Sequence, residues 1–357
     1  MKISNKIKSA LMHNVLLQII PIVAALFSVP YTIALFGEEL FSIYALGVGY
    51  LVGLNYLHLG VATNVNRDLS GLPATEIDSR SKVFWAGLVA MSIIALIITM
   101  VFLTVIPYYL ESLSLSGSRE TEEVHFFFTQ VIYQTPLVMI LILLRSVLES
   151  SLNFSVTALN RAILNTCLLS APVMVSFFNL PFFSIPYLFT FFHISALIFM
   201  GFHCRNYFVL PFPVLRLIRF FDMLKSGFSL TLISLAMLVF LYCDRYMISA
   251  NEDLGQVAYF LAPFDVLTRF SFIYGSIGAV FFPVFSSLHR QKNYRDFAWI
   301  FNGSYRLIFF GVGFPVCLVL IFSDELLGLW LGEDFARHSS GIMNLLALGV
   351  FFTGLST

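Results

Sequence analysis

The chain has 357 residues, of which 59% are hydrophobic and only 11% are charged. Soluble domains carry roughly 25% charged residues, so a water-soluble globular fold is excluded and a membrane-embedded one is expected. The net charge is zero, with 20 basic and 20 acidic residues, which excludes a broad electrostatic footprint for nucleic acid.

Ten apolar segments follow one another along the chain. Each is about 19 residues long or longer, enough to cross a hydrocarbon core of about 30 Å as a helix. Backbone groups in lipid must be satisfied within the segment, so helices are expected, and the segments are too long for barrel strands. We predict an all-α integral membrane protein. The predicted spans are 13–36, 41–64, 83–106, 126–149, 162–180, 184–204, 226–250, 256–285, 302–322 and 340–357.

The cysteines fall inside these apolar segments, without a CxxC pattern or a cysteine–histidine cluster. They are Cys167, Cys204, Cys243 and Cys317. Such cysteines are typical small buried hydrophobes. We therefore predict no metal site, no disulfide and no cofactor.

Basic residues gather in alternate loops. With a cytoplasmic N-terminus, fourteen Lys and Arg residues belong to cytoplasmic segments, and only Arg119 and Arg337 belong to the opposite loops. This positive-inside bias predicts a multi-pass protein with its N-terminus in the cytoplasm. The fourteen are Lys2, Lys6, Lys8, Arg67, Arg80, Lys82, Arg161, Arg205, Arg216, Arg219, Lys225, Arg290, Lys292 and Arg295.

A weak internal repeat suggests two lobes. Tyr31 and Tyr44 recur 215 positions later as Tyr246 and Tyr259, and the seventh span restarts on the side where the first began. A six-helix unit followed by a parallel copy is typical of transporters. We predict an N-terminal six-helix lobe over 1–220 and a partial C-terminal lobe over 221–357. That second lobe has about four helices where a complete one needs six, so we expect it to be truncated.

Arginines inside the spans are the candidate functional residues. At a helix centre each costs roughly 2.5–3.5 kcal/mol on insertion scales, so each needs an explanation. They are Arg145, Arg245, Arg269 and Arg306, and Arg67 closes the second span at its cytoplasmic end.

Arg269 lies near the middle of the eighth predicted span, with Asp265 four residues earlier on the same helical face. One interpretation is an ion pair between Asp265 and Arg269 that neutralises both charges and helps to hold the span in place. The other is a charged wall of a water-filled path, in which Arg269 meets an anionic substrate. Both interpretations stay open.

For the other arginines, structural explanations compete with functional ones. Arg145 and Glu149 have the i,i+4 spacing of an ion pair on one helix. Arg245, near the outer end of the seventh span, and Arg306, near the start of the ninth, are placed so that their side chains can snorkel to the headgroups.

Several stretches together resemble one family. The ending LHLGVATNVNR of the second span, the YCDRYMISANEDLGQVAYFLAPFDVL and VFFPVFSSL stretches, and LWLGEDFARHSSGIMNLLALGVFF are similar to the Wzx-type O-antigen and polysaccharide-unit flippases. These belong to the multidrug/oligosaccharidyl-lipid/polysaccharide (MOP) exporter superfamily, with the MATE drug exporters and the lipid II flippase. The resemblance covers essentially the whole chain and is carried by the order of several weak motifs. The family has twelve spans, two more than are predicted here.

The resemblance implies a MATE-like fold of two lobes and a flippase in the bacterial inner membrane. Its implied substrate is an undecaprenyl-pyrophosphate-linked oligosaccharide, moved from the cytoplasmic to the periplasmic leaflet by alternating access. Membrane lipids, a polysaccharide polymerase and a chain-length regulator are the other implied partners. We expect Arg269, Arg67, Arg145 and Arg245 to bind the anionic head, with Asp265 modulating Arg269, because guanidinium groups match phosphate oxygens.

Two alternatives compete with a flippase. A MATE-type exporter of cationic drugs uses the same fold but is expected to place unpaired carboxylates in its cavity. A membrane polymerase or glycosyltransferase of the same pathway is expected to have a large outside loop, whereas no loop here exceeds about 22 residues. We therefore predict a transporter and not an enzyme.

Overall fold

The computed structural model describes residues 5–356, apart from 74, 112, 114–117, 206, 208–231, 237, 241–242, 271–273, 275–280, 282–284, 286–287 and 290–291. The described residues form helices and no strands. Eight described segments are long and apolar enough to cross a membrane. The all-α prediction is therefore confirmed, and the chain is a multi-pass membrane protein.

The chain divides into two compact units. Unit 1 comprises Met1–Leu35 and Ala258–Thr357, and unit 2 comprises Phe36–Val257. The lobe boundary expected at residues 220 and 221 lies outside the described residues. The assignment of lobes from the internal repeat therefore stays a prediction.

Helix α1 (Asn5–Gly53) joins the first two predicted spans. Its backbone breaks at Gly37, with φ 81° and ψ 171°, a conformation that essentially only glycine adopts. The second span ends earlier than expected. The short 3₁₀ helix η1 (Leu54–Tyr56) follows α1, Leu59 and Gly60 take positive φ, and α2 (Val61–Ser70) begins a new helix. The prediction of one helix over 41–64 was wrong because these left-handed residues interrupt it.

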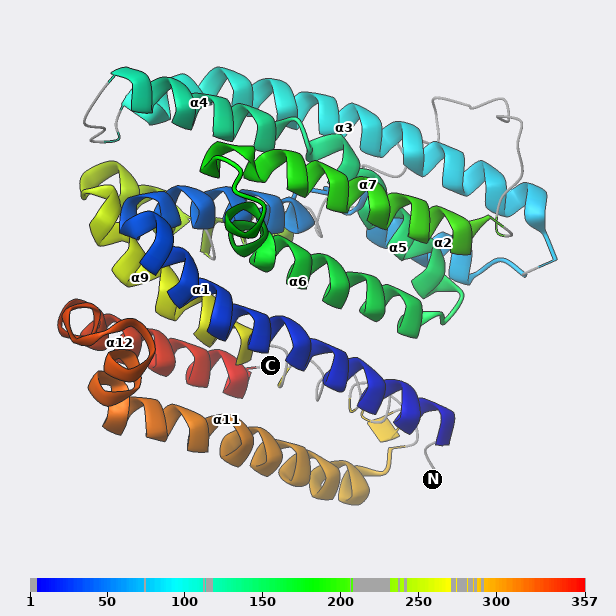
Figure 1. Cartoon of the computed structure of the whole chain (residues 1–357). Coiled ribbons are helices and arrows are strands. Elements are labelled where there is room, and N and C mark those ends of the chain that lie inside the picture. The colour runs from blue at the N-terminus through cyan, green and yellow to red at the C-terminus, as the bar shows by residue number, and fades with distance from the viewer. Residues whose placement is uncertain are drawn as a thin grey trace. The chain divides into compact units, whose positions relative to one another are not determined.

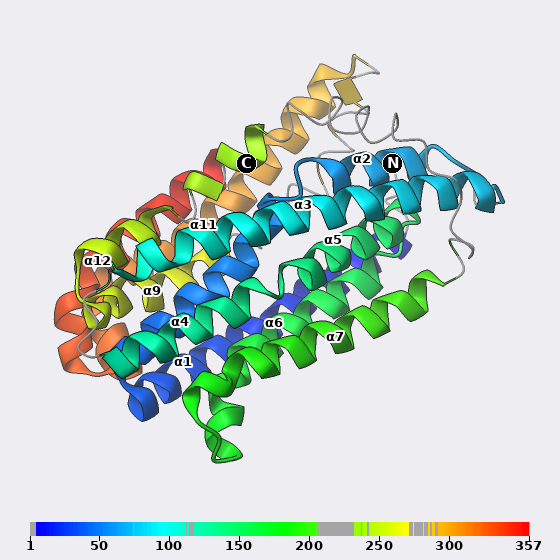
Figure 2. The same ribbon diagram turned by 90° about the horizontal axis from the view of Figure 1, so that it is seen from above.

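Unit 2 is a helical bundle with α5 near its centre. It contains α3 (Ile77–Glu111), α4 (Ser118–Ile132), α5 (Thr135–Ser150), α6 (Phe154–Phe177), η2 (Phe182–Ser184) and α7 (Ile185–Cys204). Helix α5 packs against α2, α3, α6 and α7 (Figures 1 and 2). Phe127, Met139, Leu143 and Phe189 are fully buried in this core.

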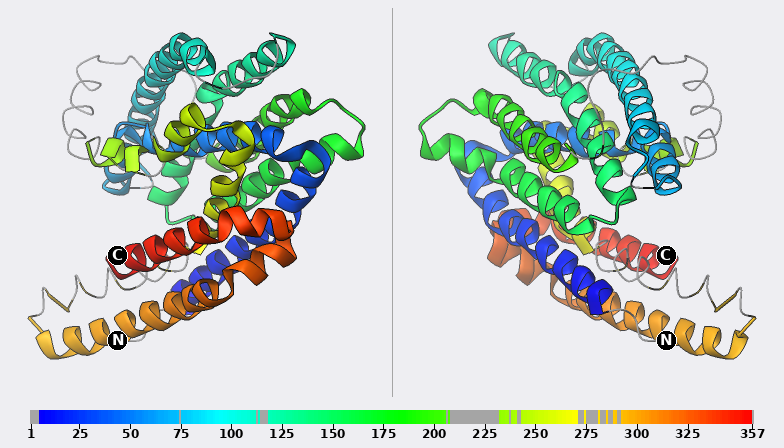
Figure 3. Two further views of the ribbon diagram at one scale, coloured as in Figure 1. Left: turned by 90° about the vertical axis from the view of Figure 1, so that its left-hand side faces the viewer. Right: turned by 90° about the vertical axis from the view of Figure 1, so that its right-hand side faces the viewer.

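Unit 1 is built on a helical hairpin of α11 (Tyr294–Leu331) and α12 (Glu333–Ser356), which lie side by side (Figure 3). Gly332, with φ 100°, makes the turn between them. Helix α9 (Leu254–Leu267) gives way to the 3₁₀ helix η3 (Thr268–Phe270). The prediction of one continuous helix over 256–285 is therefore wrong, because α9 covers its first residues but stops at Leu267. Most of the remainder lies outside the described residues.

Arg80 joins three loops at one end of unit 2. It is buried, and its guanidinium donates to the carbonyls of Leu69 (3.0 Å) and Leu72 (3.2 Å) and to Ser151 Oγ (3.1 Å). It also lies over the ring of Tyr207, 5.7 Å from the centroid. The loops after the second, fourth and sixth predicted spans thus meet at one end, as the topology requires. That this end faces the cytoplasm stays a prediction from the loop charges.

Prolines explain several contacts between helices. A proline has no N–H to donate to the carbonyl four residues earlier, and lipid offers no replacement donor. For four described prolines a side chain donates to that carbonyl. The pairs are Trp330 Nε1 to Leu26 (2.8 Å, for Pro30), Thr135 Oγ1 to Ile132 (2.7 Å, for Pro136), Tyr44 Oη to Leu168 (3.0 Å, for Pro172) and Ser339 Oγ to Tyr259 (2.5 Å, for Pro263).

The Tyr44 contact gives a first prediction. Tyr44→Phe removes the donor to Leu168 and should lower the stability of the purified protein by about 1 kcal/mol, since interhelical hydrogen bonds in membranes have about that value. Pro172→Ala restores a backbone N–H at position 172, so the same substitution should cost much less in that background. Thermal unfolding in detergent measures both. An equal loss in the two backgrounds would show that the hydroxyl does not serve the carbonyl exposed by Pro172.

Candidate functional site

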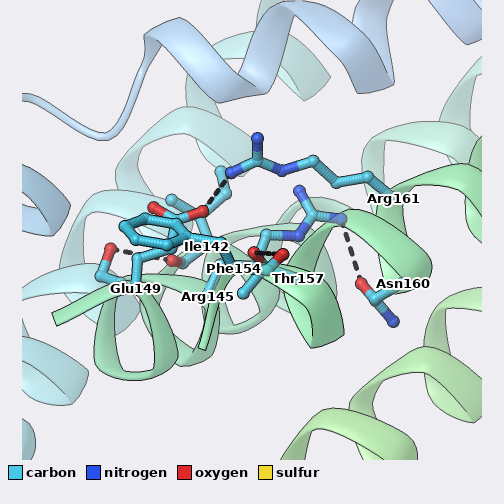
Figure 4. Close-up of polar contacts among 8 residues, drawn as sticks. Ile142, Arg145, Glu149, Phe154, Thr157, Asn160 and Arg161 are labelled. Carbon is cyan, nitrogen blue, oxygen red and sulfur yellow. Dashed lines mark hydrogen bonds and ion pairs between the residues drawn. The ribbon is translucent and has the colours of Figure 1, made fainter. Parts of the chain in front are cut away.

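The candidate site lies on the helical hairpin of α5 and α6. The chain turns through Leu152, with φ 60°, and Asn153 N donates to the carbonyl of Leu148 (2.9 Å). This backbone hydrogen bond is typical of a helix that ends on a left-handed residue. The tight turn brings the last two turns of α5 opposite the first turns of α6 (Figure 4).

Arg145, on α5, points across to α6. Its Nη2 donates to Asn160 Oδ1 at 3.4 Å, a long contact (Figure 4). The side chain is half-buried, and its Nε is buried with no hydrogen-bond partner among the described residues. The guanidinium therefore keeps donor capacity beyond its single amide contact.

Glu149 pairs with Arg161 of α6 and not with Arg145 of its own helix (Figure 4). The expected i,i+4 pair of Arg145 and Glu149 is therefore wrong. The hairpin explains the exchange, because it places Arg161 opposite the last turn of α5, where its side chain reaches the carboxylate. Among the described residues of the cluster, two arginines face one carboxylate, which leaves a net positive charge.

Arg145 also lines a small cavity of about 30 Å³, large enough to hold an ordered water molecule. Asn55, Asn165 and His193 are the other polar residues of its wall. His193 Nδ1 lies 2.8 Å from the carbonyl of Phe189. Because a carbonyl only accepts, Nδ1 carries the hydrogen and Nε2 is left as an acceptor.

Arg67 and Arg245, the other predicted site residues of unit 2, lie elsewhere. Arg67 is exposed and pairs with Asp68 at 3.1 Å. Arg245 is only 5% exposed, so it does not snorkel. Its Nη1 lies 2.8 Å from where a Cβ on Gly49 would be.

Arg145 and Arg245 approach the second half of α1 at different positions. The cavity beside Arg145 is lined by Leu51, Val52 and Asn55, whereas Arg245 meets Gly49. Leu51 lies on the opposite side of the helix from Gly49, because two residues turn an α-helix by about 200°.

Arg269 and Asp265 belong to unit 1. Asp265 is in the last turn of α9, and Arg269 is in η3, so the two are not on one continuous α-helix as expected. Both are half-buried, and Thr268 Oγ1 between them donates to the carbonyl of Phe264 (2.8 Å). Arg306, on α11, is exposed, as expected for a snorkelling side chain.

The residues around Arg145 on the two helices form what we call the α5–α6 cluster, which comprises Arg145, Glu149, Asn160, Arg161 and Asn165. Sequence reasoning missed three of these as site residues. Arg161 was placed in a cytoplasmic loop, and Asn160 and Asn165 were not considered. A usable signal was present, because two helices joined by a short turn pair residues at similar distances from that turn. Positions 145 and 160 are such a pair around residues 152 and 153.

Comparisons with known proteins agree with this architecture. No family model matches the chain. The chain is similar to a putative O-antigen transporter of Shigella flexneri, with 23% identity over 341 residues, covering 94% of this chain and 79% of that protein. The structure of the present chain is similar to that of an inward-facing multidrug resistance MATE family transporter of the MOP superfamily. The TM-score is 0.73 and the identity 13%, over 96% of this chain and 84% of the other. The chain has a MATE-like fold.

Two further solved structures share this MATE-like fold. A eukaryotic MATE transporter gives a TM-score of 0.69 at 13% identity, over 97% of this chain and 80% of that one. A MOP superfamily transporter from Pyrococcus furiosus gives 0.60 at 13% identity, over 98% and 82%. The predicted fold and the resemblance noted in the sequence are confirmed. The proteins that the chain resembles are transporters, in agreement with the prediction of a transporter.

The close approach of Arg245 to Gly49 gives a second prediction. Gly49→Ala places a Cβ 2.8 Å from Arg245 Nη1, so the guanidinium of this buried side chain must shift away from its present contacts, and such a shift is destabilising. Gly311→Ala on α11 is the matched control, since nothing lies within 4 Å of its Cβ position. The thermal unfolding temperature should fall for Gly49→Ala and stay level or rise for Gly311→Ala. Equal behaviour of the two variants would mean that Arg245 does not pack on Gly49.

Proposed function

We propose that the protein is a flippase that moves an anionic, lipid-linked oligosaccharide across the bacterial inner membrane, from the cytoplasmic to the periplasmic leaflet. The similarity to a putative O-antigen transporter supports this cargo, and the MATE-like fold supports a transport mechanism by alternating access. An undecaprenyl pyrophosphate carrier fits the chemistry, because its head is a bulky anion that cannot cross hydrocarbon unaided.

The observation that carries the proposal is the excess positive charge on the α5–α6 hairpin. Arg161 neutralises Glu149, and Arg145 has only the Asn160 amide as a hydrogen-bond partner in the described part of the chain. An arginine kept in a membrane-spanning helix without a carboxylate is costly. An anionic oxygen at its free donors offsets that cost and matches the geometry of the guanidinium.

The size of the adjoining cavity limits what Arg145 can do. A volume of about 30 Å³ has room for only a few water-sized groups. We propose that the cluster contacts an edge of the head group as the substrate enters and does not enclose it. Arg269, with Asp265 modulating its charge, and the exposed Arg67 are proposed as further contacts of the head. A polysaccharide polymerase and a chain-length regulator are proposed as partners that act on the delivered unit.

A MATE-type exporter of cations is the main alternative on this fold. Fold alone does not fix the charge of the cargo, and reversed polarity of the binding pocket suggests a different function for the transporter from Pyrococcus furiosus. A cation site needs an available carboxylate. Glu149, the carboxylate of the α5–α6 cluster, is held by Arg161, so this cluster favours an anion.

A genetic experiment tests the proposal. Deleting the gene from its host should stall surface polysaccharide and leave lipid-linked units at the cytoplasmic leaflet. In the deletion strain, the Arg145→Ala variant should give no more than about one tenth of the surface polysaccharide that the wild-type protein gives. The reason is that a charged hydrogen bond contributes about 1.5–3 kcal/mol. Arg145→Lys, which keeps the charge, should restore more than Arg145→Ala. Arg306→Ala, at an exposed position, is the control and should restore wild-type levels at equal membrane abundance.

Two outcomes would contradict the proposal. Normal surface polysaccharide in the deletion strain, together with new sensitivity to cationic dyes, would favour the cation exporter. Full activity of Arg145→Ala would remove the α5–α6 cluster from the substrate path.

A further inference from the structure

A second cavity lies in unit 2, on the face of α1 that carries Gly49. Its volume is about 180 Å³. It lies between α1, α3 and the span Leu232–Asn251, all of them candidate membrane spans. Its wall includes Gly49, Gly53, Phe102, Val239, Cys243 and Tyr246.

The wall of this cavity is suited to hydrocarbon. Gly49 and Gly53 contribute only backbone to the wall, the guanidinium of Arg245 lies in the space beside Gly49, and the remaining wall is mostly aliphatic or aromatic. Val239 is 59% exposed, so the cavity opens to the surroundings of the bundle. At a membrane-spanning segment those surroundings are lipid tails. A tail can therefore enter from the side.

The volume matches a short stretch of a branched chain. An apolar cavity of about 150 Å³ accepts benzene in a well-studied case. A cavity of about 180 Å³ therefore holds one to two five-carbon isoprene units. Moving a tail from lipid into such a cavity brings no hydrophobic gain, so affinity must come from close packing and from charge.

A buried cation lies directly behind this wall. Arg245 approaches Gly49 so closely that a Cβ there would be 2.8 Å from its Nη1. The helix that carries Arg245 is held by Tyr246 Oη, which donates to the carbonyl of Leu46 (3.3 Å), and by a hydrogen bond between Ser249 Oγ and Tyr109 Oη (2.6 Å). An apolar slot with a guanidinium beside it is suited to the junction between the hydrocarbon tail and the anionic head of a lipid.

We propose that this cavity binds the isoprenoid tail of the lipid carrier, near the phosphate end of the tail. The proposal rests on the proposed function and deepens it, because the tail then has its own site on the protein and is not left in bulk lipid. It also gives Arg245 a role distinct from that of Arg145, namely to attract the anionic end of the carrier toward the slot.

Two native cysteines allow a direct test. Cys243 lines the cavity, whereas Cys317 on α11 does not, and both are exposed. The full chain, purified in detergent, is treated with N-phenylmaleimide, and modification of each cysteine is followed by peptide mass spectrometry. Undecaprenyl phosphate at ten times its dissociation constant should slow labelling of Cys243 by about tenfold through mass action and leave Cys317 unchanged. Phosphatidylglycerol at the same concentration should protect neither cysteine.

A pair of matched variants tests whether the cavity itself is responsible. Val239 and Ile233 lie on the same helical segment and are both 59% exposed, but only Val239 lines the cavity. Val239→Trp should fill the slot and abolish protection of Cys243 by undecaprenyl phosphate. Ile233→Trp should leave that protection intact.

Three outcomes would overturn the tail site. The first is equal protection of Cys243 by phosphatidylglycerol, which would make any acyl chain an occupant. The second is an equal loss of protection in the Val239→Trp and Ile233→Trp variants. The third is a lack of protection by undecaprenyl phosphate. None of these would affect the proposed function, which is judged separately by surface polysaccharide in the deletion strain. Conversely, protection of Cys243 in a protein that does not support surface polysaccharide would leave a carrier-lipid site without flipping.

Discussion

The structure depends on one constraint, that backbone polar groups inside the hydrocarbon core must find partners within the protein. A continuous helix meets this constraint alone, but prolines break the pattern. Where Pro172 leaves the carbonyl of Leu168 without its N–H, Tyr44 of α1 supplies a hydroxyl, and where Pro263 does the same, Ser339 of α12 does so. Residues that weaken one helix thus fix its contact with another.

Arginine side chains in membrane spans also need partners within the protein, and the structure provides them in three ways. Arg80 is surrounded by carbonyl and hydroxyl acceptors at the ends of helices and is fully engaged in structure. Arg245 packs into the space left by Gly49. Among the described residues, Arg145 has the Asn160 amide as its hydrogen-bond partner, and Glu149, the carboxylate of the same cluster, pairs with Arg161. Their partners, and not their positions within the predicted spans, distinguish a structural arginine from a candidate binding one.

A MATE-like fold is compatible with cargoes of opposite charge, so the fold does not decide what is moved. The charge balance of individual clusters is more informative. The described residues of the α5–α6 cluster carry a net positive charge, and the apolar slot has the guanidinium of Arg245 beside it. We propose that the first contacts the head of an anionic lipid and the second its tail.

The sequence alone determined the membrane-embedded all-α fold, because apolar segments of span length leave no other way to satisfy the backbone. It also singled out Arg145 and Arg245 by their cost in lipid. It did not determine their partners, since i,i+4 spacing pointed to Glu149 for Arg145, whereas the hairpin turn at Leu152 gave Glu149 to Arg161. Nor did it show that the second predicted span is interrupted after α1 ends at Gly53, or that α9 ends at Leu267. The hairpin and the break in the second span depend on positive φ angles at residues such as Leu59 and Leu152, which their residue type does not announce. Only the folded structure decides these features.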